Sequence, residues 1–343
     1  MLSQKPADAD ASIRLTDTDA ALARLSAVQK QYLTDPFIRA LVPRAHLQPP
    51  RPPLINIGTF VRTVAIDDLV QQWLDIGKKC QIVSLGAGSD TRFWRLATGP
   101  YKDILAAYIE LDFAENTMKK AMAIRKSKEL GAILGNDVKL AQGGTALHSP
   151  VYHLIPADLR DPPSTSLKPL GEPTDNGKPL LDPSLPTLLL FECVLCYMSP
   201  EASNTLLRWF SDYTSAALGA IVYEMFGLED SFGKVMVSNL KARNVTLPGA
   251  GPYKTLANLP NRFLSLGYTK AQALTLKDIR KQYIDLSELE RISRLEFLDE
   301  VEELDLVLDH YAITWGVSLP SSAPSEPWRG WALKQKQREE EED

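Results

Sequence analysis

Residues 80–95 restrict the possible folds more than any other part of the chain, because an apolar strand there runs into a glycine turn and then a helix. The strand is predicted over residues 80–85, and Gly86 and Gly88 form the turn. Glycine permits backbone angles that other residues avoid, and it lets a ligand approach the main chain closely. A strand, a glycine turn and a helix in this order open the nucleotide-type sites of α/β folds. The alternative is an ordinary turn that happens to contain two glycines.

Strands and helices alternate along the rest of the chain. Apolar runs predict seven strands, at residues 80–85, 104–111, 151–155, 187–191, 220–226, 268–276 and 310–317. Helical spacing predicts helices at residues 18–39, 56–76, 115–130, 201–217, 232–243 and 286–308, with a short one ending at residue 96. This alternation predicts a doubly wound α/β sheet whose ligand site lies at the carboxyl ends of the strands.

The alternating body is expected to form a single domain, residues 19–317. Residues 162–186 contain seven prolines, which indicates a mobile surface insertion. Residues 227–266 stand where a substrate lid would be inserted.

Both termini differ from this body. Residues 1–18 are polar, and residues 318–343 begin with serines and prolines and end in five consecutive acids, so we expect both segments to be disordered. Two residues of the tail, Trp328 and Trp331, are able to dock locally.

The charge and the cysteine content exclude several classes of protein. The formal net charge of −5 provides no basic field that would favour nucleic acid. The three cysteines are too few for a disulfide scaffold and indicate a reducing compartment. No apolar run is long enough for a transmembrane helix, and the N-terminus does not resemble a signal peptide. We therefore expect a monomer of the cytoplasm, and of the nucleus as a second compartment, without a membrane or nucleic-acid partner.

The residues of the turn indicate which nucleotide-like ligand is bound. A dinucleotide fingerprint requires Gly or Ala where Thr91 stands, which argues against a nicotinamide oxidoreductase and favours a ligand without phosphate, such as S-adenosylmethionine. Asp112 or Glu110, at the end of the second strand, would accept the ribose hydroxyls. Asp158 would accept from the adenine amino group, and the Leu159 backbone would donate to the ring. Taken singly, Asp112 is equally explained as a helix cap and Asp158 as a turn residue.

Cys193 and Cys196 form a Cys-x-x-Cys pair after the fourth strand. A structural zinc site needs four ligands, and the sequence has no second cysteine pair or histidine cluster to complete one. A redox pair of the thioredoxin type would follow the first strand, so packing is the favoured interpretation and redox function the minor one. We expect no metal and, because the four histidines are scattered, no nucleophilic catalysis.

Several segments together resemble the leucine carboxyl methyltransferase family, in order from residue 19 to residue 317. They are residues 56–62 (NIGTFVR), 85–95 (LGAGSDTRFWR), 110–113 (ELDF), 157–161 (ADLRD), 192–198 (ECVLCYM), 232–240 (FGKVMVSNL) and 295–300 (LEFLDE). The resemblance implies a class I, Rossmann-like methyltransferase with a seven-stranded sheet, a reversed last strand, an N-terminal helical lid and an inserted substrate-binding segment. It implies S-adenosylmethionine as cofactor. The implied substrate is the C-terminal leucine carboxylate of the protein phosphatase 2A catalytic subunit.

The resemblance also implies roles for individual residues. Cofactor binding falls to Arg24, Arg62, Gly86, Gly88, Asp112, Asp158, Leu159 and Glu192. Among these, Asp112 would hold the ribose, Asp158 and Leu159 the adenine, and Glu192 would face the methionine ammonium. Arg62 would hold a carboxylate, either the cofactor's or the substrate's, and Tyr197 would contact the same place through its hydroxyl. Arg62 and Tyr197 are therefore the predicted catalytic residues.

The predicted chemistry needs no general base, because a C-terminal carboxylate, with a pKa of roughly 3.3–3.7, is already ionised at neutral pH. Catalysis would come from positioning, which contributes roughly 7–11 kcal/mol in favourable cases. The alternatives are a related methyltransferase with another acceptor, either a small molecule or a transfer RNA of the wybutosine type, and an inactive adaptor that binds the phosphatase. The transfer-RNA relatives carry an additional propeller domain, which a chain of 343 residues cannot accommodate.

Overall fold

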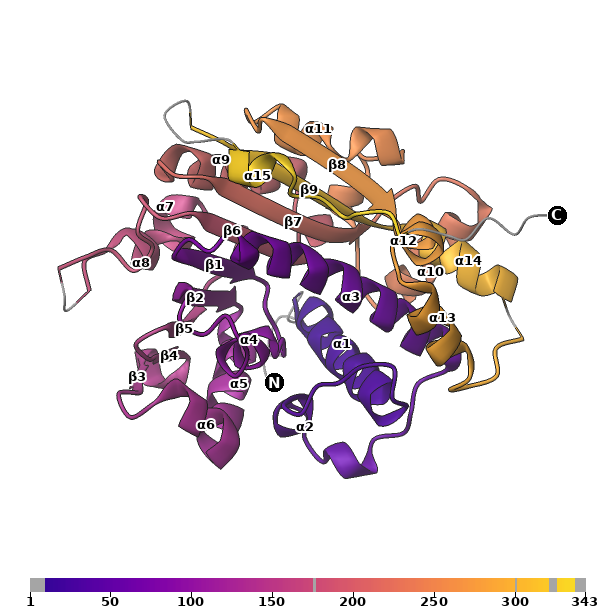
Figure 1. Ribbon diagram of the computed structural model, residues 1–343, viewed down its shortest axis with the longest axis horizontal. Helices are drawn as coiled ribbons and strands as arrows, with labels where there is room; N and C mark the ends of the chain where they lie inside the picture. Colours follow the sequence, from indigo (N-terminus) through magenta and orange to yellow (C-terminus); the bar gives the residue numbers. More distant parts are fainter. Residues whose placement is uncertain (1–9, 175–176, 300, 321–325, 337–343) are drawn as a thin grey trace, which may run out of the picture.

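The computed structural model describes residues 10–174, 177–299, 301–320 and 326–336 (Figure 1). Nine strands within these ranges form one mixed sheet. They are β1 (Cys80–Leu85), β2 (Leu105–Asp112), β3 (Lys139–Ala141), β4 (Ala146–His148), β5 (Tyr152–Pro156), β6 (Thr187–Glu192), β7 (Leu218–Met225), β8 (Lys270–Thr275) and β9 (Tyr311–Ser318).

The order of the strands places a ligand site at the middle of the sheet. The order is β3-β4-β5-β2-β1-β6-β7-β9-β8, so the chain runs outward in one direction from β1 and in the other from β6. Both strands pair in parallel, with Leu85 opposite Leu111 on β2 and opposite Phe191 on β6, and their carboxyl ends therefore lie level. Such a reversal point is where open α/β sheets bind ligands. The last strand, β9, is antiparallel to β7 and β8, which confirms the predicted doubly wound sheet with a reversed last strand.

The sheet has two more strands than the seven predicted. The short strands β3 and β4 form an antiparallel hairpin at the β5 edge, and Gly143 and Gly144 turn the chain between them with positive φ angles. Each strand has only three residues. This length is too short for the alternation of apolar and polar residues that identifies a strand.

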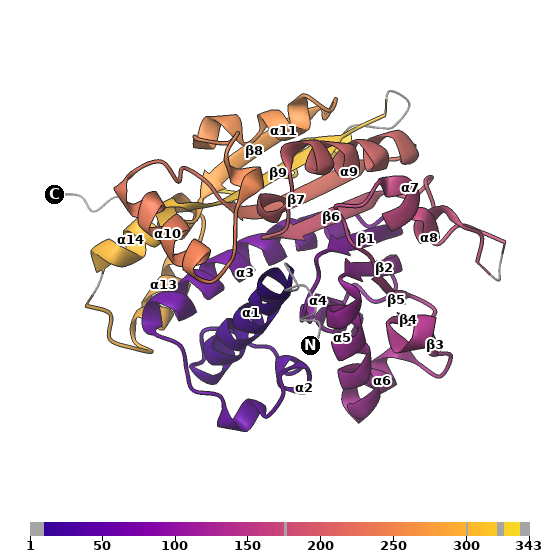
Figure 2. The same ribbon diagram turned by 180° about the vertical axis from the view of Figure 1, so that it is seen from behind.

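Helices cover both faces of the sheet. They are α1 (Ala11–Gln29), α2 (Ile38–Leu41), α3 (Pro53–Asp75), α4 (Arg92–Ala97), α5 (Ala114–Lys126), α6 (Lys128–Leu134), α7 (Pro163–Ser166), α8 (Lys168–Gly171), α9 (Pro200–Tyr213), α10 (Ser231–Ala242), α11 (Asn261–Leu264), α12 (Leu276–Gln282), α13 (Leu286–Ser293), α14 (Val301–Asp309) and α15 (Glu326–Arg329), with 3₁₀ turns η1 (Ala45–Leu47), η2 (Gln142–Gly144), η3 (Leu195–Tyr197), η4 (Pro248–Ala250) and η5 (Leu256–Asn258). One core joins the sheet to α3, α5 and α12, and the other joins it to α8, α9 and α11 (Figures 1 and 2).

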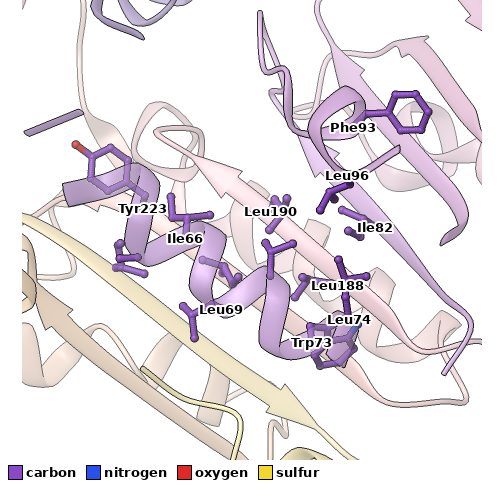
Figure 3. Packing of buried hydrophobic residues seen from close by; sticks show 14 of the residues in the cluster. Ile66, Leu69, Trp73, Leu74, Ile82, Phe93, Leu96, Leu188, Leu190 and Tyr223 are labelled. Atoms are coloured by element: carbon purple, nitrogen blue, oxygen red, sulfur yellow. The ribbon is translucent and has the colours of Figure 1, made fainter. Parts of the chain in front are cut away.

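Helix α3 is the centre of the first core. Its residues Ile66, Leu69 and Trp73 are almost fully buried and face Leu188 and Leu190 of β6 (Figure 3). Burial of one such side chain contributes about 1.5–3 kcal/mol. The packing fixes α3 across the centre of the sheet and thereby fixes the position of the polar residues in its first half.

Three segments are more ordered than the sequence indicated. Helix α1 begins at Ala11, so the predicted disorder of residues 1–18 is wrong from there on, and residues 1–9 lie outside the described ranges. In the proline-rich insertion, Leu167, Leu170 and Leu181 are fully buried against the second core, while residues 175–176 are not described. The prolines there begin one-turn helices, because their fixed φ suits the first helical position.

The predicted tail also contains an ordered part. Trp328 and Trp331 are buried against Trp73 of α3, with ring centroids 5.9 and 5.1 Å from it, as local docking of these residues required. The indole nitrogen of Trp331 donates to the Leu69 carbonyl at 2.8 Å. Disorder is therefore wrong for this part of residues 318–343, and the acidic end, residues 337–343, lies outside the described ranges.

The long helix predicted for residues 286–308 is two helices, α13 and α14. The LEFLDE segment lies between them and, as far as it is described, is not helical; residue 300 is not described. Asn56 of α3 donates to the Glu296 carboxylate at 2.7 Å, which ties this segment to the start of α3.

Candidate active site

A cavity of about 650 Å³ opens at the carboxyl ends of β1, β2 and β6, and α1 and α10 contribute to its lining. The structure brings together on its lining nine of the residues that the sequence singled out, all except Glu110: Arg24, Arg62, Gly86, Gly88, Asp112, Asp158, Leu159, Glu192 and Tyr197. These residues come from α1, α3 and the carboxyl ends of β1, β2, β5 and β6 or the turns that follow them. They are far apart in the sequence and become neighbours only in the folded chain.

The floor of the cavity, which we define as Gly86, Gly88 and Asp112, is built by the backbone. Gly86 has a φ of 64° and Gly88 a φ of 48°, in the left-handed region that favours glycine. A Cβ on Gly86 would lie 2.5 Å from a methyl of Val194, and one on Gly88 would overlap the Asp17 carboxylate. The Gly88 N–H donates to Asp112 Oδ2 at 2.7 Å, so the turn and the acid form one unit.

Asp112, and not Glu110, faces the cavity, which resolves an alternative left open by the sequence. Glu110 is fully buried away from it, within 2.5 Å of Lys120 Nζ and 2.7 Å of the Tyr152 hydroxyl. Burial raises the pKa of Glu110 to about 7, although Lys120 opposes the shift. Burial also raises the pKa of Asp112 above its ordinary value, because the hydrogen bonds from Gly88 and Asn116 offset desolvation only in part.

Asp158 lies next to Leu159 on the cavity lining and is held by Arg160. Arg160 donates to Asp158 through Nε at 2.9 Å and to both oxygens of Asp10 at 2.7 and 2.8 Å. Burial alone would raise the pKa of Asp158, but the bonds and the charge of Arg160 hold it below its ordinary value. Arg160 thus joins the predicted adenine site to the residue that precedes α1. The sequence reasoning missed this pair because Asp10 stood in a segment predicted to be disordered.

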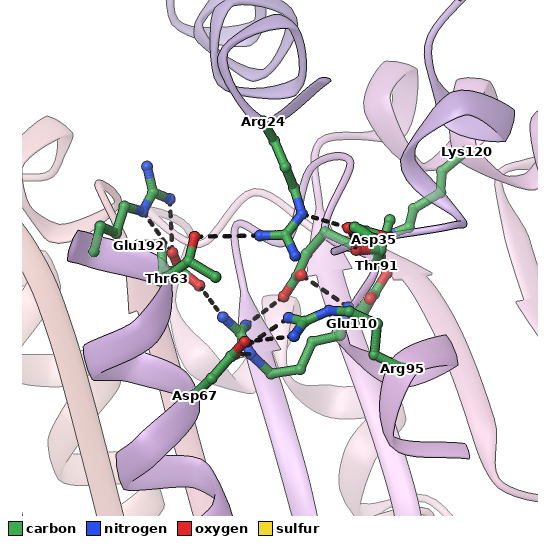
Figure 4. Close-up of polar contacts among 12 residues, drawn as sticks. Arg24, Asp35, Thr63, Asp67, Thr91, Arg95, Glu110, Lys120 and Glu192 are labelled. Atoms are coloured by element: carbon green, nitrogen blue, oxygen red, sulfur yellow. Dashed lines mark hydrogen bonds and ion pairs between the residues drawn. The ribbon is translucent and has the colours of Figure 1, made fainter. Parts of the chain in front are cut away.

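At the end of β6, the strand that pairs with β1, lies a group of partly buried ion pairs, which we call the arginine wall and define as Arg62, Glu192, Arg92 and Asp67. Arg62 contacts Glu192 Oε2 through two nitrogens, each at 2.7 Å. Arg92 contacts the other oxygen of Glu192 at 2.9 Å and reaches Asp67 at 3.0 Å, so Glu192 and Asp67 lie on two sides of one network (Figure 4). Burial would raise the pKa of Glu192, but the two arginines hold it below its ordinary value.

The arginine wall differs from what the sequence predicted. Glu192 was expected to face an ammonium and Arg62 a ligand carboxylate, whereas here the two residues pair with each other. The sequence did not indicate the pairing of Arg92 with Asp67. In the structure Arg92 is only 2% exposed, and a buried charge needs a partner. The signal in the sequence was the position of Arg92, which follows the glycine turn closely.

Helix α1 is held over the floor by polar contacts. The Asp17 carboxylate accepts from the Ser89 N–H at 2.6 Å. Arg24 reaches Asp35 Oδ2 at 2.5 Å, and Thr91 Oγ1 donates to the same oxygen. Thr91, which argued against a dinucleotide, therefore helps to hold the chain segment that follows α1.

Tyr197 lies in η3 on the wall of the cavity. Burial keeps the pKa of its hydroxyl well above the ordinary value, so the group is protonated at neutral pH and is able to donate a hydrogen bond. Within the described ranges no three His, Cys, Asp or Glu side chains gather closely enough to hold a metal ion. None of the described helices is long and apolar enough to cross a membrane.

Comparisons with known proteins agree on one family. The family model described as leucine carboxyl methyltransferase matches residues 12–211. Leucine carboxyl methyltransferase 1 of Cryptococcus neoformans is 45% identical, over 90% of this chain and 93% of its own. The Aspergillus fumigatus protein of the same name is 39% identical over 94% and 86% of the two chains. The Arabidopsis thaliana homologue is 36% identical over 90% of each chain.

Proposed function

The chain belongs to the leucine carboxyl methyltransferase family, which makes it an S-adenosylmethionine-dependent carboxyl methyltransferase, and we propose that its acceptor is the C-terminal leucine of the protein phosphatase 2A catalytic subunit. The observation that carries the proposal is that all nine predicted site residues line one cavity at the reversal point of the sheet.

The floor fits S-adenosylmethionine by its shape and by its charge. The side chains of Val194 and Asp17 pack so closely against Gly86 and Gly88 that only glycine fits at these two positions of the turn. The acidic groups around it, Asp17, Asp112 and Asp158, would repel a pyrophosphate but accept from hydroxyl and amino groups. In this assignment Asp112 holds the ribose, Asp158 and Leu159 hold the adenine, and the bound cofactor supplies an activated methyl group.

The arginine wall fits a ligand that carries ionic groups. A carboxylate entering the cavity needs a cation, and Arg62 is able to grip it with two nitrogens. Glu192 is then released by Arg62 but stays ionised, because Arg92 still holds its other oxygen. In that arrangement Glu192 faces a cation such as the methionine ammonium, and both predicted roles follow from one exchange of partners.

An apolar part of the remaining lining fits a leucine side chain. Met225 at the end of β7 lines it together with Met236 and Leu240 of α10. Helix α10 lies within residues 227–266, the predicted substrate lid. Arg62 and this apolar surface line the same cavity. They match the two groups of a terminal leucine, which are a carboxylate and a branched alkyl side chain.

The residues of this site have to position the acceptor, not to deprotonate it. A terminal carboxylate is ionised at neutral pH, so no base is required. Arg62 orients the carboxylate, the Tyr197 hydroxyl donates to it, and α1 with α10 excludes water. Orientation of this kind supplies roughly 7–11 kcal/mol where the alignment is good.

The decisive experiment is transfer of labelled methyl from S-adenosylmethionine to purified phosphatase 2A. We expect incorporation into the intact catalytic subunit and none into a subunit that lacks the terminal leucine. Unfractionated transfer RNA serves as the alternative acceptor, and labelling of RNA would contradict the proposal. Calorimetric titration with S-adenosylmethionine separates an inactive adaptor, which would release no heat.

We also propose that the protein acts as a monomer in the cytoplasm. The three cysteines are free thiols, as a reducing compartment requires. Light scattering coupled to gel filtration measures the mass, and a mass of twice 38.1 kDa would contradict the monomer.

A further inference from the structure

The Cys-x-x-Cys pair lies in the wall of the cavity, in the turn that joins Glu192 to Tyr197. Cys193 lines the cavity and is partly exposed, whereas Cys196 is fully buried behind it. The two cysteines stand three residues apart in the turn that contains η3, and their thiols influence each other's pKa. Cys193 has a φ of 57°, a strained conformation for a residue with a side chain. Packing alone does not explain why a strained cysteine should face the ligand.

We infer that Cys193 and Cys196 form a thiol-modification site that takes a peroxide and closes to a disulfide, which distorts the cavity and weakens binding of S-adenosylmethionine. The inference concerns the cofactor cavity and holds whatever the acceptor is.

Cys193 is the thiol that reacts first. The hydrogen bond from Cys196 lowers the pKa of Cys193, and the Arg62 charge adds to this against the effect of burial. The third cysteine, Cys80 on β1, is the opposite case, because burial raises its pKa to about 12. The thiolate is the nucleophile in such reactions, so a peroxide that enters the cavity meets a reactive Cys193, while Cys80 stays inert.

The chemistry balances with peroxide as the only oxidant. The Cys193 thiol first releases its proton to solvent, and the thiolate attacks one peroxide oxygen. The O–O bond breaks, Cys193 becomes a sulfenic acid, and the departing hydroxide takes up a proton and leaves as water. The Cys196 sulfur then attacks Cys193 sulfur, forms the S–S bond and displaces a second water. The two sulfur atoms lose two electrons in total, and the peroxide gains them.

The turn has little room to accommodate this bond. A disulfide holds its sulfur atoms about 2.05 Å apart, closer than a hydrogen-bonded pair of thiols. On one side the Val194 methyl lies 2.5 Å from where a Cβ of Gly86 would be, and on the other side Gly249 packs directly against the Leu195 carbonyl. Contraction of the turn therefore moves its ends, Glu192 and Tyr197, and presses Val194 against the floor.

The test is oxidation of the full-length protein with hydrogen peroxide, followed by thiol counting under denaturing conditions and calorimetric titration with S-adenosylmethionine. The wild type, which has three cysteines, should fall to one free thiol, and the peptide that contains both cysteines should lose two hydrogens. Cofactor affinity should fall at least tenfold and return with dithiothreitol.

Two variants complete the test. Cys80→Ala is the matched control and should behave as the wild type does, apart from its missing thiol. Cys196→Ala should form no disulfide, and its oxidation should stop at a Cys193 sulfenic acid that dimedone labels. The inference is overturned if all three wild-type thiols survive, if the disulfide forms without a change in affinity, or if dimedone labels no sulfenic acid in Cys196→Ala.

Discussion

The floor and the arginine wall lie at neighbouring strand ends of one site but are built in different ways. The floor is held by a bond from a backbone N–H to Asp112 and by two left-handed glycines, and its members lie within 27 residues of one another. The wall is held by ion pairs between side chains of α3, α4 and the end of β6, up to 130 residues apart. A ligand enters the floor as it stands, whereas it enters the wall only by replacing one of the existing partners.

We therefore expect the floor to determine the affinity for the cofactor and the wall to determine the orientation of the acceptor carboxylate. In the function we propose, the floor offers acceptors to the neutral part of the cofactor and fixes where it lies. In the same proposal, the wall keeps its charges neutralised until an incoming carboxylate takes Arg62 from Glu192. Removing the only partner of a buried ion destabilises a protein by roughly 3–5 kcal/mol. Because Arg92 also contacts Glu192, the Glu192 carboxylate keeps a partner when Arg62 turns to the acceptor carboxylate.

The strongest way to sharpen the comparison is Arg62→Ala. Glu192 keeps Arg92 as partner, so the fold should survive, but the acceptor carboxylate loses its cation. We expect kcat/KM for methyl transfer to fall about 10³-fold, equivalent to about 4 kcal/mol, with the melting temperature nearly unchanged. Steady-state kinetics and thermal unfolding measure the two quantities.

Arg62→Lys is the matched control, since it keeps the charge but loses the two-nitrogen grip. It should recover part of the lost activity. Near-normal turnover of the alanine variant would remove Arg62 from the mechanism, and a large loss of stability would mean that Arg92 does not suffice for Glu192.

A smaller effect is expected on the floor, from Gly86→Ala. The new Cβ meets Val194, and φ stays in the left-handed region, so we expect a loss of about 2 kcal/mol in the free energy of unfolding. Adding Val194→Ala should return about half of this loss, because it relieves the contact but not the backbone strain. Denaturant unfolding of the single and double variants measures both parts, and no loss in the single variant would mean that the floor is not preformed.

The same contrast explains which part of the site the sequence revealed. Gly86, Gly88 and Asp112 were predictable because they lie at or near the carboxyl ends of predicted strands and because glycine has a local, physical reason to be in the turn. The doubly wound sheet with a reversed last strand was predictable as well, since alternation and connection rules leave few arrangements.

The partners in the wall were not predictable from local pattern. Which carboxylate meets Arg62 depends on the rotation of α3 over β6, which the packing of Ile66, Leu69 and Trp73 decides. The hairpin of β3 and β4 was not predicted for a different reason. A strand of three residues is too short to show the alternation of apolar and polar residues that identifies a strand. Helix α1 began earlier than expected because its first turns are stabilised by tertiary contacts, such as the bond from Ser89 to Asp17, and not by an apolar face of their own.

The smallest expected effect distinguishes the floor from the wall by pH. The pKa of Asp112 is raised, mainly by burial, while that of Glu192 is lowered against burial by its two arginines, so the titrations of the two groups are shifted in opposite directions. Protonated Asp112 loses an acceptor for the ribose. Affinity for S-adenosylmethionine should therefore be constant at high pH and fall, by up to about tenfold per unit, once the pH drops below the raised pKa. Asp112→Asn should bind more weakly but lose this dependence, whereas Glu192→Gln should keep it. Calorimetric titration between about pH 8 and about pH 4.5 measures the dependence. If Asp112→Asn and Glu192→Gln exchanged these behaviours, the wall and not the floor would hold the titrating group.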